Sequence, residues 1–187
     1  MTKRTLYATM TVGSAVGLIA SFLQMLEKLS LLKNPHAALM CNINSVFSCT
    51  NVLNAWQSSV FGFPNSLMCI VFFSLTLGVA LAGLRPDLQR WLRLMMHGFT
   101  LFFLCFGLWF LAESTYVVNA LCIYCVFCFS GLLLINFAWL RLNVDALPLS
   151  DGSRKSLQRG INRGADIFGW LLLALCMAIA MTLHFHH

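Results

Sequence analysis

The chain has 187 residues, of which 59% are hydrophobic and only 10% are charged, and its formal net charge is +6. A soluble domain carries about 25% charged residues, so this composition excludes a soluble globular protein. We attribute the excess of basic residues to membrane topology and to attraction by anionic lipid of the bilayer, and we predict no nucleic-acid partner.

Five apolar stretches are each long enough to cross a hydrocarbon core about 30 Å thick. They are Thr5–Leu26, Val60–Leu84, Trp91–Ala112, Ala120–Leu142 and Ile167–Phe185. The first stretch follows two basic residues as a signal peptide does, but it is longer than a typical signal sequence and has no cleavage-site pattern, so we predict a retained helix. The sequence therefore predicts an all-α, multi-pass membrane protein.

The basic residues predict which loops face the cytoplasm, because short loops rich in Lys and Arg stay on that side. Ten of the 12 lie before the first span, around the turn between the second and third spans, or from the end of the fourth span through the connection that follows it. The N-terminus is therefore predicted to be cytoplasmic, and the first loop, the third loop and the C-terminal tail to lie outside. Residues 143–165 are predicted to form a basic cytoplasmic linker, and residues 166–187 a fifth transmembrane helix with a short outer tail.

The eight cysteines fall into two classes by their predicted depth. Four are expected to pack as small apolar side chains within the spans: Cys69, Cys105, Cys128 and Cys176. The other four are expected at the outer face, where an oxidising compartment permits disulfides: Cys41, Cys49, Cys122 and Cys125. The second class holds the candidates for chemistry.

The first outer loop, residues 27–59, carries a helical pattern. Apolar residues recur at steps of three and four from Val46 to Val60, which predicts a half-helix at about 46–58 lying in the membrane interface. Asn44 or Ser45 is well placed to cap its start.

Cys41 and Cys49 are predicted to have different surroundings in this loop. Cys49 lies on the apolar stripe of the half-helix and is expected to point toward the protein. Cys41 precedes it by eight residues in the polar run CNINS and is expected to sit in water. A static disulfide that clamps the loop is the alternative.

Cys122 and Cys125 form a C-x-x-C motif at the start of the fourth span, a spacing that closes a disulfide within one helical turn. The helix N-terminus stabilises a thiolate there. Two pairs on one face can pass two electrons by disulfide exchange. A zinc site of four cysteines usually repeats the short spacing, which Cys41 and Cys49 do not, so we predict no metal. A non-enzymatic membrane protein with structural or metal-binding cysteines is an open alternative.

The electron acceptor is expected to be a quinone, because the sequence has no nucleotide-binding fingerprint and no haem-attachment motif. Phe129 lies four residues beyond Cys125 and thus one turn beneath it. Asn65 is a costly polar group at membrane depth, which makes it a candidate hydrogen-bond partner of a quinone carbonyl. Phe72, deeper in the second span, and Trp56 of the loop helix complete the predicted quinone contacts.

The order of these motifs resembles the vitamin K epoxide reductase (VKOR) family, particularly its bacterial quinone-linked homologues. The motifs are Cys41-x₇-Cys49, the sequence VFGFPNS at the end of the loop helix, and CIYC at the start of a later span. The resemblance covers the first four spans and implies a catalytic four-helix bundle at residues 1–142 around a quinone site, with ubiquinone or menaquinone as the acceptor.

The resemblance also implies a relay. Cys41 would accept electrons from a secreted thioredoxin-fold, DsbA-like partner, Cys49 would exchange with Cys122, and Cys125 would face the quinone. The protein would lie in the bacterial inner membrane with its redox cysteines in the periplasm. Because the sequence stops at His187 without the fused thioredoxin domain of many bacterial members, we expect the partner to be a separate protein.

Two features refine this expectation. Phe129 stands where the vertebrate enzymes have a tyrosine, which favours plain quinone reduction over epoxide chemistry. The DsbB type of oxidase performs the same reaction with two cysteine pairs and is the alternative scaffold. It carries the C-x-x-C pair in its first outer loop, however, whereas here that pair lies in the second.

Overall fold

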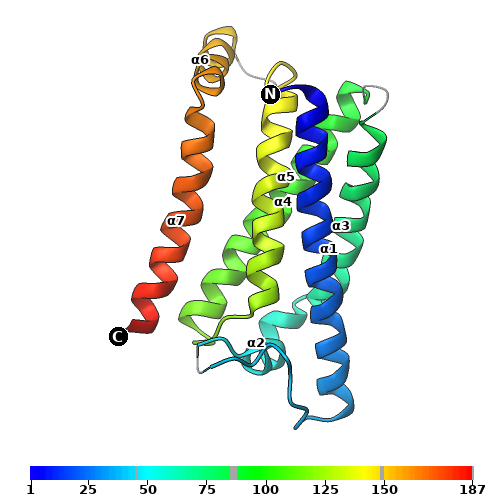
Figure 1. Ribbon diagram of the computed structural model, residues 1–187, viewed down its shortest axis with the longest axis vertical. Helices are drawn as coiled ribbons and strands as arrows, with labels where there is room; N and C mark the ends of the chain where they lie inside the picture. Colours follow the sequence, from blue (N-terminus) through cyan, green and yellow to red (C-terminus); the bar gives the residue numbers. More distant parts are fainter. Residues whose placement is uncertain (45, 85–87, 148–149, 187) are drawn as a thin grey trace.

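The computed structural model describes residues 1–44, 46–84, 88–147 and 150–186. Its elements are α1 (Lys3–Lys33), α2 (Cys49–Asn54), the 3₁₀ helix η1 (Trp56–Ser59), α3 (Asn65–Ala82), α4 (Arg90–Tyr116), α5 (Ile123–Asn143), α6 (Asp151–Asn162) and α7 (Ala165–His186) (Figure 1). Five of these helices, α1, α3, α4, α5 and α7, are long and apolar enough to cross a membrane. The predicted all-α, multi-pass architecture is confirmed.

The helices differ from the predicted spans mainly at the end of the bundle that carries α2. Helix α1 continues to Lys33, well past the predicted end at Leu26. Helix α3 begins at Asn65 and not at Val60. Gly62, with a φ of +82°, interrupts the helical path ahead of it.

The bundle is organised around α1, which packs against both α5 and α3, while α4 packs against α5. Helices α1 and α5 approach most closely at two glycines. A Cβ atom on Gly13 would lie 2.9 Å from the carbonyl oxygen of Gly131, and one on Gly131 would lie 2.6 Å from the carbonyl oxygen of Gly13. Small residues allow this approach, which is the usual way for membrane helices to gain packing contacts.

Buried polar side chains join the helices at two further points. Ser14 on α1 donates to Thr76 on α3 at 3.1 Å. Thr100 on α4 and Asn136 on α5 pair at 3.0 Å, and the Asn136 amide also donates to the Thr100 carbonyl at 3.2 Å. Interhelical hydrogen bonds of this kind hold membrane helices in a fixed register because hydrocarbon offers the same groups no partner.

The loop between α1 and α3 closes one end of the bundle and is tied to the segment before α5. Phe47 and Leu121 form a parallel β-bridge. Leu121 donates its N–H to the Val46 carbonyl at 2.8 Å, and Ser48 donates to the Leu121 carbonyl at 3.1 Å. Two segments far apart in sequence, each ending in a cysteine, are therefore held side by side.

The loop helix is shorter than the predicted half-helix at 46–58. Residues 46–48 are not helical because they pair with Leu121, so α2 begins only at Cys49 and is preceded by Ser48 as its N-cap residue. Ala55 is extended and separates α2 from η1. Of the two predicted caps, Asn44 instead accepts from the N–H groups of Val46 and Phe47, and Ser45 lies outside the described residues.

The fifth spanning helix stands apart from the bundle. Helix α6 lies at the end of the molecule opposite α2, and α7 runs from it back toward the α2 end (Figure 1). In the most apolar 18-residue stretch of α7, 0% of the residues are buried, whereas in the corresponding stretch of α5 50% are buried. Helix α7 therefore contributes little to the protein core.

We predict that Gly131→Ala lowers the free energy of unfolding of the purified protein by about 1–3 kcal/mol, because the added methyl group overlaps the backbone of α1. Thermal unfolding in detergent, followed by intrinsic fluorescence, measures the change. Gly98→Ala on α4 is the matched control, since a Cβ atom there meets nothing within 4 Å. Equal stability of the two variants would show that α1 and α5 do not pack at the glycines.

Candidate active site

Cys41 and Cys49 form a disulfide in the loop between α1 and α3. Both are buried, with 2% and 0% of their surfaces exposed. The expectation that Cys41 sits in water is therefore wrong, because the disulfide draws Cys41 into the same packed environment as Cys49. The residues next to it, Met40 and Ile43, are 89% and 62% exposed.

Other contacts hold α2 against the bundle. The Lys28 ammonium on α1 donates to the carbonyl oxygen of Leu53. The Ser58 hydroxyl donates to the same oxygen at 2.7 Å, which fastens η1 to the end of α2. The short helix that begins at Cys49 is thus fixed at its far end as well as by the β-bridge before it.

Cys49 and Cys122 are brought into contact although 73 residues separate them in sequence. Their sulfur atoms lie 3.3 Å apart, and both side chains are buried. The β-bridge causes this approach, since Cys49 follows Ser48 and Cys122 follows Leu121. A thiolate on Cys122 faces one sulfur of the loop disulfide, as disulfide exchange requires.

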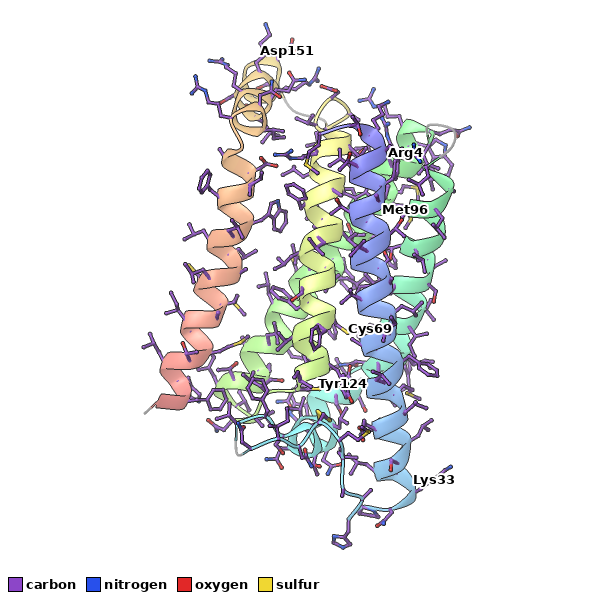
Figure 2. All side chains as sticks on the ribbon, viewed as in Figure 1. Arg4, Lys33, Cys69, Met96, Tyr124 and Asp151 are labelled. Atoms are coloured by element: carbon purple, nitrogen blue, oxygen red, sulfur yellow. A yellow bond between two sulfur atoms is a disulfide. The ribbon has the colours of Figure 1, made fainter. Side chains whose placement is uncertain are left out.

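Cys122 occupies the N-cap position of α5, directly before the spanning segment. The pKa of its thiol lies below the ordinary value, chiefly because the Cys125 thiol donates a hydrogen bond to its sulfur. Backbone N–H groups of Cys125 and Tyr124 act in the same direction, while burial opposes them. Cys122 is therefore the sulfur of this pair that more readily carries negative charge. Figure 2 marks Tyr124, which lies in the first turn of α5.

Cys125 also lines a cavity among α1, α3, α4 and α5. The cavity has a volume of about 50 Å³. Its aromatic walls are Phe103, Phe106, Phe110 and Phe129, and its sulfur-bearing walls are Cys69, Cys125 and Cys128. Figure 2 shows Cys69 at this level of the bundle. The space matches one or two water molecules, so a larger ligand enters only if the aromatic side chains move apart.

Two amide side chains make the cavity polar at the level of Cys125. Gln24 on α1 donates from Nε2 to the Cys125 sulfur at 3.3 Å. Asn65, at the start of α3, donates from Nδ2 to the Gln57 carbonyl at 2.7 Å. The buried Oδ1 of Asn65 has no hydrogen-bond partner among the described residues. An amide nitrogen carries two hydrogens, so each of these groups can still bind a ligand.

The structure places two of the four predicted quinone contacts at the cavity and the other two elsewhere. Asn65 and Phe129 line the cavity. Phe72 does not: it is buried behind the cavity wall, with its ring stacked on Phe103 at 4.1 Å between centroids. Trp56 is 67% exposed and packs against Trp109 on the outside of α4, because the break at Ala55 changes the direction of the chain.

Gln24 was not among the sequence-based candidates. A signal for it was present, since Gln24 is the one amide within the predicted first span and polar groups at membrane depth are costly. The four cysteines expected to pack also differ from one another. Cys105 and Cys176 are exposed on the outer surfaces of their helices, whereas Cys69 and Cys128 line the cavity. Cys128 donates to the Gly17 carbonyl at 3.6 Å.

A disulfide whose sulfur touches a C-x-x-C thiol is arranged for the exchange of disulfides with thiols. In the described residues no group of His, Cys, Asp and Glu has the arrangement of a metal site. Fold and site together define a membrane thiol–disulfide oxidoreductase.

Sequence comparison agrees with this class. The model of the vitamin K epoxide reductase family matches residues 8–140, which is more than half of the chain. The protein belongs to this family. No match to a curated protein was found.

We predict that Cys125→Ala moves the pH midpoint for alkylation of Cys122 upward, because the hydrogen bond that lowers the pKa of Cys122 is lost. A small thiol reagent and peptide mass spectrometry give the rate at Cys122 as a function of pH. Cys128→Ala is the matched control, since that thiol makes no hydrogen bond to Cys122 and should leave the midpoint in place. An unchanged midpoint in Cys125→Ala would contradict the assigned hydrogen bond.

Proposed function

We propose that the protein reoxidises a thioredoxin-fold, DsbA-like partner and passes the electrons to ubiquinone or menaquinone in the bacterial inner membrane. The observation that carries this proposal is the 3.3 Å contact between the sulfurs of Cys49 and Cys122. It links the loop disulfide to the cysteine pair that borders the apolar cavity.

The first step is exchange with the partner. A partner thiolate attacks the Cys41 sulfur, forms a mixed disulfide and releases Cys49 as a thiolate. The second partner thiolate then displaces Cys41, so the partner leaves oxidised and both loop cysteines are reduced. Cys41 is buried, and the loop must open to admit the partner. Its exposed neighbours Met40 and Ile43 offer the apolar surface on which a partner can dock.

The second step moves the electrons inward. The Cys49 thiolate attacks a Cys122–Cys125 disulfide at Cys122 and releases Cys125. The Cys41 thiolate then attacks Cys49, which restores the loop disulfide and leaves Cys122 reduced. The outer pair is bonded and the inner pair is free in the structure, a state that matches the end of this step.

The third step uses the cavity. The chemistry supplied by a bound quinone is the acceptance of two electrons and two protons, which returns Cys122 and Cys125 to the disulfide. Gln24 stabilises negative charge on the Cys125 sulfur through its N–H donor. Asn65 can donate its second amide hydrogen to a carbonyl, and its unpartnered oxygen can accept from a hydroxyl. The aromatic wall leaves room for only one or two water molecules beside the reacting sulfur.

The orientation in the membrane follows from charge. Nearly all the basic residues lie at the end of the bundle that carries the N-terminus and α6, and we place this end in the cytoplasm (Figure 2 marks Arg4 and Asp151 there). The redox cysteines at the α2 end then face the periplasm. We assign catalysis to residues 1–142, since the family match ends at residue 140. We assign 143–165 to a cytoplasmic linker and 166–187 to a membrane anchor.

We predict that alanine at any of the four relay cysteines abolishes quinone reduction by the reduced partner. Anaerobic mixing of reduced partner, protein and quinone, with quinone absorbance as the readout, measures the turnover. When oxidised partner replaces reduced partner, the Cys41 thiolate of Cys49→Ala should attack the partner disulfide, release one partner thiol and accumulate a mixed disulfide between Cys41 and the partner. In Cys125→Ala the Cys122 thiolate should attack the loop disulfide at Cys49, release Cys41 and form a disulfide between Cys49 and Cys122. Cys41→Ala should trap no partner.

Cys105→Ala is the control for this series, because its thiol is exposed on the outside of α4 away from the cavity. It should turn over at the rate of the unmodified protein. Turnover that persists in Cys41→Ala or Cys125→Ala would rule out the relay.

We also predict that Gln24→Leu slows quinone reduction about tenfold while exchange with the partner keeps its rate, since a hydrogen bond to a charged group contributes about 1.5–3 kcal/mol. Single-turnover mixing separates the two steps. Gln158→Leu, the same chemical change on α6 at the far end of the molecule, is the control. If Gln24→Leu slows both steps equally, Gln24 acts on folding and not on Cys125.

A further inference from the structure

Gln57 in η1 joins a charged residue of α4 to an amide that lines the cavity. Gln57 is buried, with 3% of its surface exposed. Its Nε2 donates to Glu113 Oε2 on α4 at 3.0 Å. Its backbone carbonyl accepts from Asn65 Nδ2 at 2.7 Å. Glu113 and Asn65 are therefore connected through a single residue.

Glu113 lies where a helix does not favour negative charge. It occupies the last turn of α4, which ends at Tyr116, and the helix dipole disfavours a carboxylate at that end. Glu113 is half-buried and is not among the residues that line the cavity. Helix α4 gains no stability from a carboxylate at this position, so we look for the role of Glu113 in the residue that it binds.

Aromatic contacts bring the same segment to α4. Four residues before Glu113, Trp109 packs on Trp56 with 6.4 Å between the ring centroids. Three residues earlier still, Phe106 packs on Phe61 at 5.8 Å. Residues 106, 109 and 113 share one flank of α4, because they are spaced by three and four. The aromatic pairs place the segment on that flank, and the hydrogen bond to Glu113, which depends on direction, fixes how Gln57 is turned.

The orientation of the Asn65 amide follows from that of Gln57. Asn65 is 7% exposed and lines the cavity. Because its nitrogen donates to the Gln57 carbonyl, the amide cannot turn over and exchange its oxygen and nitrogen. One amide hydrogen remains for a ligand, as does Oδ1, which has no partner in the part of the chain that the structure describes. A ligand that meets a fixed amide does not have to order it, so it binds more tightly.

We propose that Glu113 is a positioning residue of the cavity, which acts through Gln57 to hold the Asn65 amide ready for a quinone carbonyl. This role rests on the proposed function, in which Asn65 binds the quinone. Glu113 itself does not touch the quinone, and it takes no part in disulfide exchange between Cys49 and Cys122. Its loss therefore weakens the binding of quinone and leaves the exchange of disulfides at its rate.

The test measures quinone binding and disulfide exchange separately in the full protein. Protein reduced by dithiothreitol, and then freed of it, is mixed anaerobically with a short-chain ubiquinone, and quinone absorbance is followed over one turnover. The dependence of the rate on quinone concentration gives the half-saturating concentration and the limiting rate. In a second assay, the rate at which dithiothreitol reduces the Cys41–Cys49 disulfide reports on exchange.

We expect Glu113→Ala to raise the half-saturating quinone concentration about tenfold, with a limiting rate within about twofold of that of the unmodified protein, because the lost hydrogen bond is to a charged group. Gln57→Ala should have the same effect. The double variant should bind quinone no more weakly than either single variant, since both changes release the same amide. Glu113→Gln should restore most of the affinity, because its amide oxygen can still accept from Gln57. All four variants should react with dithiothreitol at the unmodified rate.

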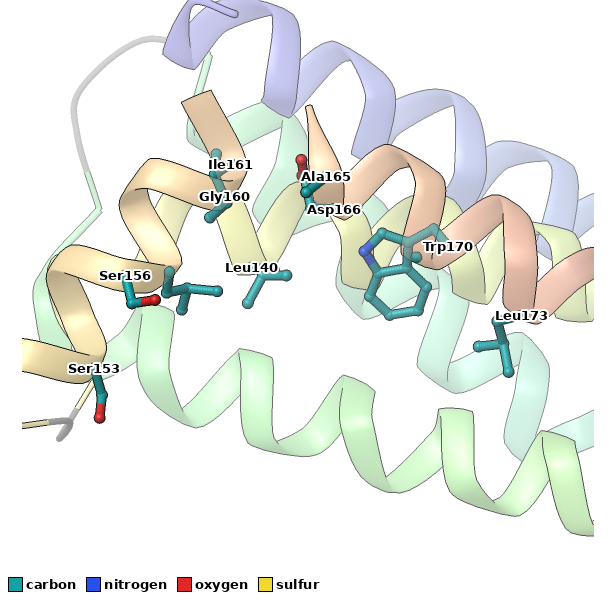
Figure 3. A pocket seen from close by; sticks show the side chains of 11 residues that line it. Leu140, Ser153, Ser156, Gly160, Ile161, Ala165, Asp166, Trp170 and Leu173 are labelled. Atoms are coloured by element: carbon teal, nitrogen blue, oxygen red, sulfur yellow. The ribbon is translucent and has the colours of Figure 1, made fainter. Parts of the chain in front are cut away.

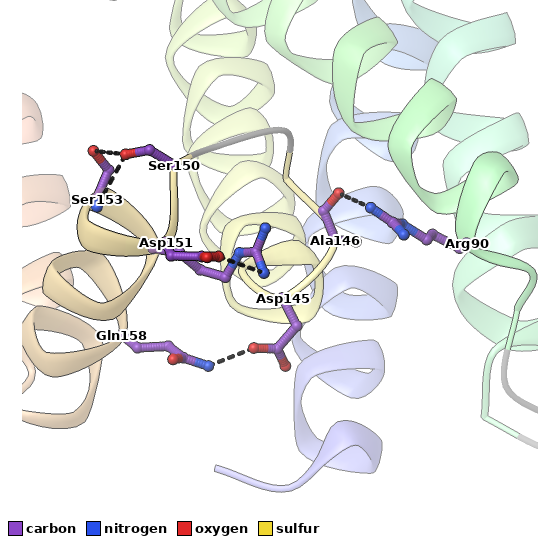
Figure 4. Close-up of polar contacts among 8 residues, drawn as sticks. Arg90, Asp145, Ala146, Ser150, Asp151, Ser153 and Gln158 are labelled. Atoms are coloured by element: carbon purple, nitrogen blue, oxygen red, sulfur yellow. Dashed lines mark hydrogen bonds and ion pairs between the residues drawn. The ribbon is translucent and has the colours of Figure 1, made fainter.

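Two variants at the α6 end of the molecule are the controls. Asp145→Ala removes a carboxylate that also accepts a hydrogen bond from a glutamine, Gln158 (Figure 4). Trp170→Phe controls for quinone that enters other space, because Trp170 lines an open space of about 760 Å³ beside α6 (Figure 3). Both variants should bind and reduce quinone as the unmodified protein does.

Four results would overturn the positioning role and leave the proposed function standing. The first is an unchanged half-saturating concentration in Glu113→Ala. The second is an additive effect of Glu113→Ala and Gln57→Ala, which would separate their actions. The third is a Glu113→Gln variant as impaired as Glu113→Ala, which would assign the effect to charge alone. The fourth is equal slowing of quinone reduction and of exchange, which would assign Glu113 to folding.

A different result tests the proposed function itself. If the unmodified protein, once reduced, does not transfer electrons to the quinone, the proposed function fails and the positioning role of Glu113 fails with it.

Discussion

The close packing of α1 against α5 is the constraint on which the redox site depends. The two helices run antiparallel and touch at Gly13 and Gly131, where neither position has room for a Cβ atom. From that contact, Gly17 on α1 meets Cys128 on α5, and further along Gln24 meets Cys125. Because side chains on a helix repeat every 3.6 residues, a shift of a single residue would turn Gln24 away from the sulfur. The glycines thereby set the environment of the cysteine that borders the cavity.

The second constraint is the β-bridge between the loop that joins α1 to α3 and the segment before α5. It is made of backbone hydrogen bonds, and it sets the cysteines that follow Ser48 and Leu121 opposite each other. The two constraints place Cys122 between the loop disulfide and the cavity in the bundle. The contact between the two cysteine pairs is thus made at one short stretch of chain. Helix α7, which contributes to neither, lies outside the residues matched by the family model.

Much of the fold could be predicted because its signals are local. Stretches of about 20 apolar residues identified the five spanning helices, and the positions of the cysteines relative to those spans separated the candidates for chemistry from the rest. Asn65 and Phe129 were predicted to contact a quinone, which stays a prediction; the structure shows that both line the cavity beside Cys125. The half-helix was predicted too long, since nothing in its own sequence reveals that residues before Cys49 pair with Leu121.

The sequence by itself therefore determined the membrane-spanning architecture, the positions of the two cysteine pairs along the chain, and the polar residue Asn65 at the start of α3. Only the tertiary structure decided which side chains meet. It buried Cys41, drew Gln24 to Cys125, and left Phe72 behind Phe103 and Trp56 on the outer surface. The physical reason is that hydrophobicity fixes how deep a residue lies in the membrane, whereas the direction in which it points depends on close packing between helices that are distant in sequence.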